Sequence, residues 1–190
     1  MLKVLQVTES FGGGIIHSMS QICRGLSHEI QFHVLHGYRA ETPKDYQACF
    51  PSSVNFMSWT VSKKIGFKQG LDALKELDRA ICRIQPDVIH MHSSEAGEVA
   101  RMLPVSNDRK VIYSPRGFSF LRRDVSCIKR QAYRTIEKVL GMCNHITVAC
   151  GLGEYQEALK VSKHSYLIPN MIDLYERKTS LSLAKPLFQL

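Results

Sequence analysis

The chain alternates short apolar runs with amphipathic segments, and this alternation constrains its fold more than any other feature. Apolar runs bounded by turn residues predict strands at residues 3–8, 30–35, 54–59, 87–92, 110–114, 145–149 and 165–168. Apolar residues at helical spacing predict helices at residues 16–26, 71–84, 94–103, 128–142 and 154–160. Continuous apolar strands that alternate with helices predict an α/β fold, a three-layer doubly wound parallel sheet of the Rossmann-like class.

Length and charge narrow the class further. With 190 residues, of which 44% are hydrophobic, the chain suits one folded domain. The composition excludes collagen-like, low-complexity and largely disordered chains. Twenty-five Lys and Arg against 17 Asp and Glu give a formal charge of +8. An acidic partner is therefore expected, and charge alone does not choose among nucleic acid, anionic lipid and a phosphorylated metabolite.

The six cysteines lack C-x-x-C spacing and lie within or beside apolar segments. They are Cys23, Cys49, Cys82, Cys127, Cys143 and Cys150. We interpret them as reduced core residues of a cytoplasmic protein. The first residues lack the pattern of a signal peptide, and no run reaches the roughly 18 apolar residues of a spanning helix. Any membrane association is expected to be peripheral, at the inner face.

Ligands of open parallel sheets bind beyond the carboxyl ends of the strands, so the loops there are the candidate site. After the first predicted strand come Gly12, Gly13 and Gly14, followed by His17. Glycines allow close approach of a ligand to the backbone, and the start of a helix favours an anion. A tight turn between strand and helix is the structural alternative for the same glycines.

A pair of histidines ends the fourth predicted strand. His90 and His92 are two residues apart, so their side chains lie on one face of the strand. Three interpretations remain open: a metal site, for which no third ligand is evident, a packed histidine, or a ligand cleft lined by His92 and Ser93.

Arg116 follows the fifth predicted strand. An arginine at that position suits bidentate binding of a phosphate or carboxylate. A surface ion pair is the alternative.

The predicted helix at residues 128–142 separates apolar from basic side chains. Its apolar positions are Ile128, Ala132, Ile136, Val139 and Cys143. The basic positions opposite are Arg123, Arg130, Arg134 and Lys138. Such a basic face either docks on anionic lipid or is merely solvated. Nucleic acid is not expected as a partner, because only Tyr133 interleaves with the basic residues and no nucleic-acid motif occurs.

Several enzyme motifs are missing. Gly12-x-Gly14 continues without the third glycine of a dinucleotide fingerprint, and the second strand ends in His36-Gly37 rather than an acid. Neither a phosphate loop nor a nucleophile elbow is present. These absences weaken a third hypothesis, that of a complete small Rossmann enzyme that uses a nicotinamide or nucleotide. A thermal-shift screen with such cofactors would test it.

Five segments, taken in order, resemble one known family. They are Val4-Leu-Gln-Val-Thr-Glu-Ser-Phe-Gly-Gly-Gly14, Asp87-Val-Ile-His-Met-His-Ser93, Tyr113-Ser-Pro-Arg-Gly-Phe-Ser-Phe120, His145-Ile-Thr-Val-Ala149 and Tyr166-Leu-Ile-Pro-Asn-Met-Ile-Asp173. Over nearly its whole length the chain resembles the N-terminal half of the family-four glycosyltransferases of the GT-B fold. Those enzymes transfer sugars from nucleotide donors with retention of configuration.

The resemblance implies roles for residues of this chain. The glycine loop Gly12 to Gly14 and His17 would approach the substrate, His92 and Ser93 would line the cleft, and Asn170 would join them. Arg116 stands where many relatives place a histidine near the reacting sugar. A guanidinium cannot serve as a general base, so a catalytic Arg116 would stabilise the leaving pyrophosphate.

The resemblance also implies a division of labour. Residues 1–173 match the acceptor-side domain, which would bind a sugar or lipid-linked sugar in envelope polysaccharide or glycolipid synthesis. Residues 174–190 are expected to be a linker or tail, too short for the C-terminal domain that binds the nucleotide sugar. The chain is therefore expected to be inactive without a partner chain, to self-associate or capture that partner, and to need no cofactor or metal. The alternative is a non-catalytic module that docks through its basic face on membrane, glycan or protein.

Overall fold

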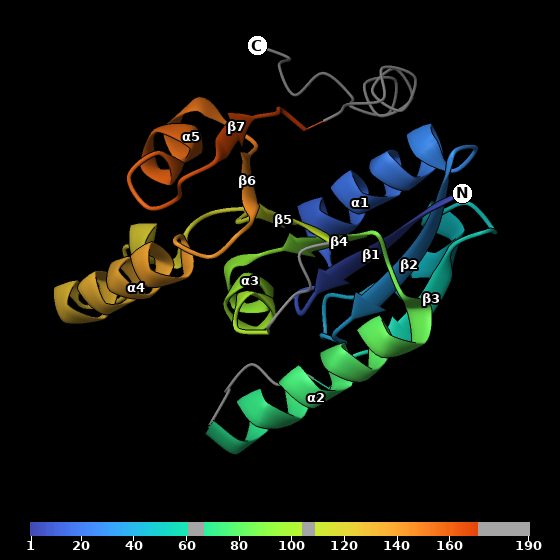
Figure 1. Ribbon diagram of the computed structural model, residues 1–190, viewed down its shortest axis with the longest axis horizontal. Coiled ribbons are helices and arrows are strands. Elements are labelled where there is room, and N and C mark those ends of the chain that lie inside the picture. The colour runs from blue at the N-terminus through green and yellow to red at the C-terminus, as the bar shows by residue number, and fades with distance from the viewer. Residues whose placement is uncertain (61–66, 104–108, 171–190) are drawn as a thin grey trace, which may run out of the picture.

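The computed structural model describes residues 1–60, 67–103 and 109–170, and these form one parallel seven-stranded sheet flanked by helices (Figure 1). The strands are β1 (Leu2–Thr8), β2 (Ile30–His36), β3 (Asn55–Ser58), β4 (Val88–His92), β5 (Lys110–Ser114), β6 (Ile146–Ala149) and β7 (Ser165–Leu167). The helices are α1 (Gly13–Leu26), α2 (Phe67–Ile84), α3 (Ser94–Arg101), α4 (Cys127–Leu140) and α5 (Leu152–Ala158), with short 3-10 turns η1 (Tyr46–Cys49) and η2 (Ser119–Leu121). The predicted α/β class and Rossmann-like sheet are confirmed.

The strand order is β3-β2-β1-β4-β5-β6-β7, so the order reverses beside β1. Thr8 at the end of β1 pairs with His36 of β2 and His92 of β4, and His92 pairs with Ser114 of β5. The carboxyl ends of these central strands therefore lie level with one another. Because a doubly wound sheet opens a crevice at this point, the register places the predicted loops at a single edge.

Two hydrophobic cores cover the two faces of the sheet. Alternate side chains of the central strands, such as Leu5 and Met91, pack with α2, α3 and α5. The opposite set, such as Val4 and Phe32, packs beneath α1 and η1. Figure 1 shows α1 on one side of the sheet and α2 with α3 on the other. Fewer helices cover the α1 side, where the described elements are α1 and the short turn η1.

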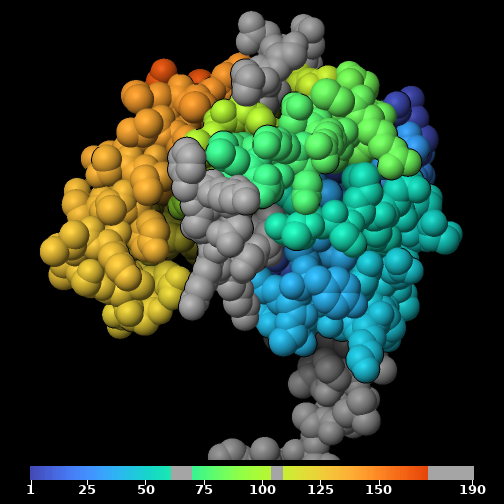
Figure 2. Space-filling model, turned by 90° about the horizontal axis from the view of Figure 1, so that it is seen from below, coloured from blue at the N-terminus to red at the C-terminus, as the bar shows by residue number. Residues whose placement is uncertain are grey.

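The orientation of α4 differs from the sequence prediction. Its apolar positions face outward, and Ile128 is 83% exposed. Glu137 occupies the inward face, fully buried, and accepts hydrogen bonds from Arg101 Nη2 and Tyr113 OH, both at 2.8 Å. Because a buried carboxylate must be paired, this network fixes the rotation of the helix against the apolar pattern. In Figure 2 the gold surface of this region stands at one flank of the molecule.

The sequence predicts that the six cysteines are reduced and lie in the core, and the structure agrees with the second point for only some of them. All six thiols are free, and Cys23 is buried in the α1-side core. Three others are exposed, namely Cys82, Cys127 and Cys143. The prediction of core positions is therefore wrong for these three, which lie on the outer sides of their helices or just beyond them.

Two further predictions concern the domain boundary and the membrane. Residues 171–173 of the predicted domain and the predicted tail at 174–190 lie outside the described residues. Within the described part of the chain, no helix is both long and apolar enough to cross a bilayer.

Candidate functional site

Arg116 is the centre of the site at the carboxyl edge of the sheet. It follows β5 with a φ of 56°, in the left-handed region that non-glycine residues rarely adopt. Ser93, directly after β4, has a φ of 84°. Backbone strain at the ends of two neighbouring strands is typical of functional loops, because the surrounding fold must hold it in place.

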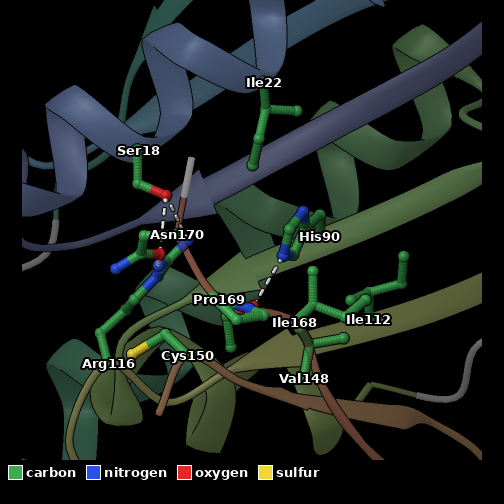
Figure 3. Close-up of a pocket in the computed structure, with 11 residues that line it drawn as sticks. Ser18, Ile22, His90, Ile112, Arg116, Val148, Cys150, Ile168, Pro169 and Asn170 are labelled. Atoms are coloured by element: carbon green, nitrogen blue, oxygen red, sulfur yellow. Dashed lines mark hydrogen bonds between the residues drawn. The ribbon is translucent and has the colours of Figure 1, made fainter. Parts of the chain in front are cut away.

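The guanidinium of Arg116 gathers three elements that are far apart in the sequence (Figure 3). Nη1 donates to Asn170 Oδ1 after β7, and Nη2 donates to Ser18 Oγ of α1 at 2.7 Å. Nη2 also lies 3.4 Å from His92 Nδ1 at the end of β4. The structure therefore brings together three of the candidate site residues, Arg116, His92 and Asn170, and adds Ser18.

None of these acceptors carries a negative charge. Among the described residues, no carboxylate forms an ion pair with Arg116, whose Nε is buried without a hydrogen-bond partner. The nearby Glu154 instead accepts from the backbone N–H groups of Gly117 and Cys150, at 2.6 and 2.8 Å. Burial lowers the pKa of Arg116 from its ordinary value, yet a guanidinium stays protonated. The predicted alternative of a surface ion pair is therefore not what the described residues form.

His90 and His92 share a face of β4, as predicted, with ring centroids 4.0 Å apart. Burial lowers the pKa of His90 to about 3 and that of His92 well below its ordinary range, so both are neutral near pH 7. His90 Nε2 lies 2.9 Å from Ser114 Oγ. Because Arg116 only donates, His92 Nδ1 accepts and its Nε2 carries the proton, buried and without a partner.

Metal ligands do not gather around this pair. Across residues 1–60, 67–103 and 109–170, no three His, Cys, Asp or Glu side chains come together as a metal would require. The contacts of the two rings with Ser114 and Arg116 instead favour packing. The residue of this pair that lines the cavity beside Arg116 is His90, not the predicted His92.

Ser93 has a structural role that the sequence did not reveal. Its hydroxyl donates to Glu9 Oε2, and the same oxygen accepts from the N–H of Ala96 at 3.0 Å in the first turn of α3. Glu9 is almost fully buried, and burial raises its pKa, which Arg39 at 3.6 Å opposes. Ser93 thus couples β1 to α3 and does not line the cavity beside Arg116.

The glycine loop opens α1. Gly13 begins the helix with a φ of 51°, and a side chain at Gly12 would come within 3.1 Å of Glu41 Cγ. Gly14 and His17 are exposed, and a Cβ added at Gly13 or Gly14 would meet no atom within 4 Å. The geometry of the turn thus explains why Gly12 and Gly13 are glycines. The space around Gly13 and Gly14 is open, and the approach of a ligand to them stays a prediction.

A cavity of about 220 Å³ lies beside Arg116, between α1 and the strands β4 to β7. Its lining residues are Ser18, Ile22, His90, Ile112, Ser114, Arg116, Val148, Cys150, Ile168, Pro169 and Asn170. Figure 3 shows the polar groups of Ser18, Arg116 and Asn170 gathered at one end and isoleucine and valine side chains at the other. This arrangement can bind a small anion and exclude water from one side of it.

The predicted basic face is divided in the structure. Arg130 Nε donates to Phe120 O at 3.2 Å, and Arg134 pairs with Glu157 at 3.2 Å while lying 4.6 Å over the ring of Phe120. Arg123 precedes α4, and both Arg123 and Lys138 are exposed. Arg130 and Arg134 are thus held by contacts within the fold, while Arg123 and Lys138 are exposed, and docking through this face stays a proposal.

Sequence reasoning missed Ser18, which is 5% exposed and contacts both Arg116 and Asn170. The signal in the sequence was a serine among the apolar residues that the helical spacing places on the inner face of α1. Ile22, one turn further along α1, lines the same cavity. Because Ser18 and Ile22 are four residues apart, they lie on the same face of α1, one at the polar part of the cavity and the other at its apolar part.

Comparison with solved structures shows the fold. Sucrose-phosphate synthase from Thermosynechococcus elongatus matches at 12% identity over 97% of this chain and 53% of its own, with a TM-score of 0.69. HepE from Anabaena, solved with UDP and glucose, matches at 12% identity over 96% and 50%, with a TM-score of 0.65. UDP-GlcNAc 2-epimerase from Methanocaldococcus jannaschii matches at 15% identity over 89% and 45%, with a TM-score of 0.57. The chain thus has the GT-B-type fold and spans about half the length of these proteins.

Sequence comparison adds one relative. No protein-family model matches the chain. An uncharacterized 41.2 kDa protein of a cps region in Klebsiella pneumoniae is 38% identical over 78 residues, which cover 38% of this chain and 22% of that protein. Membership of family four is therefore carried forward as a proposal.

Proposed function

We propose that this chain is the acceptor-side domain of a retaining, nucleotide-sugar-dependent glycosyltransferase. One observation carries the proposal: the Arg116 guanidinium faces a cavity at the carboxyl edge with only neutral hydrogen-bond partners among the described residues. A desolvated cation of this kind favours an anionic ligand. The GT-B-type fold and the relative from a cps region support a substrate of polysaccharide or glycolipid synthesis.

The proposed reaction divides between two domains. The acceptor hydroxyl forms a bond to the anomeric carbon of the donor, the bond from that carbon to the nucleoside diphosphate breaks, and the hydroxyl proton passes to the departing phosphate oxygen. Arg116 binds the phosphate of the acceptor through its fixed positive charge and takes no part in proton transfer. This role differs from the stabilisation of the leaving pyrophosphate that the resemblance implies. Gly12 to Gly14 and His17 approach the substrate from α1, while a second domain outside residues 1–190 holds the donor.

Ligand-dependent unfolding tests this division. The purified chain is expected to be stabilised by sugar phosphates and unaffected by UDP-sugars or GDP-sugars in a thermal-shift assay. A ligand at 100 times its Kd adds about 2.7 kcal/mol to the free energy of unfolding, which such an assay resolves. Stabilisation by nucleotide sugars, or sugar transfer by the chain alone, would contradict the proposal.

A second function, docking on a membrane surface, rests on the outward face of α4. Ile128 is 83% exposed and Val139 54%, and exposed Lys129 and Lys138 flank them on the same helix. Apolar side chains flanked by lysines suit an anionic bilayer surface. Flotation with anionic vesicles tests this. Ile128→Asp is expected to reduce vesicle binding strongly, whereas Gln131→Asp, which adds the same charge on the same helix, is expected to reduce it less. Equal binding by wild type and Ile128→Asp would remove this function.

A further inference from the structure

The α1 side of the sheet has an uncovered stretch. Its hydrophobic core takes side chains from β1, β2 and β3 and from Val88 of β4, but among the described residues it takes none from β5, β6 or β7. Ile112 of β5, Val148 of β6 and Ile168, just after β7, face this side and are only partly covered. A parallel sheet normally buries both faces, so this stretch is an apolar surface without a partner among residues 1–60, 67–103 and 109–170.

The stretch is shaped as a groove along α1. Ile22 of α1 faces Ile112, Val148 and Ile168 across the cavity (Figure 3). Strand alternation places Tyr166 on the same face as Ile168, and helical spacing places Leu26 one turn beyond Ile22. Side chains at the far end of the groove are exposed, since Tyr166 is 56% and Leu26 39% exposed. The apolar surface thus continues beyond the cavity, away from the carboxyl edge.

The polarity of this groove changes along its length. Helix α1 runs back from the carboxyl edge, so Ser18 lies level with Arg116 and Asn170 while Ile22 lies further down. The polar end holds donors on Ser18, Arg116 and Asn170, and the apolar end holds none from these residues. His90 and Ser114 also line the cavity, but they lie 2.9 Å apart and hydrogen-bond to each other. The guanidinium of Arg116 therefore makes the polar end the one suited to an anion.

The Arg116 guanidinium is the charged group at the polar end. It has no carboxylate in hydrogen-bond contact among the described residues, and its buried Nε has no partner. An unpaired buried donor is costly, so it indicates a ligand that accepts hydrogen bonds. A phosphate monoester, with three acceptor oxygens and up to two charges, satisfies more of the donors on Arg116, Ser18 and Asn170 than a carboxylate does.

We propose that this groove binds an amphiphilic phosphate, with its phosphate against Arg116 and its apolar chain between α1 and β5 to β7. A cavity of about 150 Å³ can hold benzene, so one of about 220 Å³ holds roughly nine heavy atoms. That is enough for a phosphate and the first carbons of the chain, and the remainder lies along Tyr166 and Leu26. This inference rests on the proposed function and names its acceptor as a lipid-linked phosphate.

Isothermal titration calorimetry below the micelle concentration tests the proposal with four probes. Geranyl phosphate and octyl phosphate carry both features, whereas geraniol lacks the phosphate and inorganic phosphate lacks the chain. We expect both chain phosphates to bind at least about tenfold more tightly than geraniol or inorganic phosphate, because each buried methylene adds to affinity. A preference between the two would distinguish an isoprenyl from a straight-chain source.

Matched variants locate the ligand. Arg116→Met is expected to weaken geranyl phosphate at least about tenfold while leaving geraniol unchanged. Ile168→Ser, at a side chain that is 57% exposed, is expected to weaken geranyl phosphate and leave inorganic phosphate unchanged. Leu159→Ser removes an equally exposed apolar side chain at the end of α5, on the other face of the sheet, and is expected to change neither. Circular dichroism of each variant confirms that it is folded.

Two results would overturn the proposal that the ligand is an amphiphilic phosphate. Equal affinity for geranyl phosphate and inorganic phosphate would reduce the site to a simple anion site, and the proposed function would survive if sugar phosphates still bound at Arg116. Concentration-dependent self-association that Ile168→Ser abolishes, without binding of any probe, would assign the groove to a second copy of the chain. Stabilisation by nucleotide sugars would instead contradict the proposed function itself.

Discussion

Arg101 is buried and Arg116 is half-buried, and the two side chains differ in the charge of their hydrogen-bond partners. Arg101 is 6% exposed, pairs with Glu137 at 2.8 Å, lies 4.0 Å over the ring of Tyr113 and donates to Gly97 O at 2.9 Å. Arg116 contacts the neutral groups of Ser18, His92 and Asn170. The first guanidinium is paired directly with a carboxylate, and the second is not paired in this way among the described residues, where the nearby Glu154 accepts from backbone N–H groups.

The difference separates a structural cation from a binding cation. The Arg101 network joins α3, α4 and β5, so its energy serves the packing of the domain. Arg116 lies beside a cavity on a strained loop, where a missing counter-charge costs stability unless a ligand supplies it. The contrast can be tested by changing one partner at a time.

The largest effect is expected from Glu137→Ala. It leaves Arg101 buried without its carboxylate, which costs about 3–5 kcal/mol of the free energy of unfolding. Urea denaturation followed by circular dichroism measures this loss. As a matched control, Glu157→Ala breaks the more exposed pairs with Arg134 and Lys160 and should cost less than about 1 kcal/mol. Similar losses for both variants would refute a structural role for the Arg101 network.

A pH-dependent effect is expected from Glu98, beside the same network. Burial, and then the negative Glu137, raise the pKa of Glu98 to about 7. The folded state therefore keeps a proton that the unfolded state loses, so this group lowers stability as pH rises from about 4.5 to 7. Glu98→Gln is expected to raise the free energy of unfolding above pH 7 by at most about 3 kcal/mol, with no gain below pH 4. A gain that is independent of pH would contradict this account.

A smaller loss is expected from Tyr113→Phe. It removes the hydroxyl that donates to Glu137 Oε1 and leaves the ring beneath Arg101 in place. Loss of a hydrogen bond to a charged acceptor costs about 2 kcal/mol. Chemical denaturation measures it, and in a Glu137→Ala background the same change should cost much less. Additive losses in the double variant would show that the two residues do not act together.

The smallest effect, of opposite sign, is expected from Arg116→Met. Replacing an unpaired, desolvated cation with an apolar side chain should leave the free energy of unfolding unchanged or raise it by up to about 1 kcal/mol. Arg101→Met should lower it, because Glu137 would remain buried without its pair. If both substitutions destabilise the domain equally, the distinction between the two arginines is lost.

The sequence was sufficient for the order of strands and helices, because periodicity reports which faces are buried. Strand ends also predicted Arg116 at the carboxyl edge, whereas Asn170, which accepts a hydrogen bond from it, was implied only by the family resemblance. The sequence failed on α4, where the pairing of Glu137 with Arg101 outweighs the apolar pattern. Such pairing depends on three-dimensional contacts that periodicity does not encode, as does the inclusion of Ser18 in the site.

The most direct test of the central claim is the free energy of unfolding in increasing inorganic phosphate at constant ionic strength, for wild type, Arg116→Met and Arg123→Met. Arg123 is exposed and serves as the control cation. We expect phosphate to stabilise the wild type and Arg123→Met to the same degree, and to leave Arg116→Met unchanged. Equal stabilisation of all three proteins would contradict the claim that Arg116 is a binding cation.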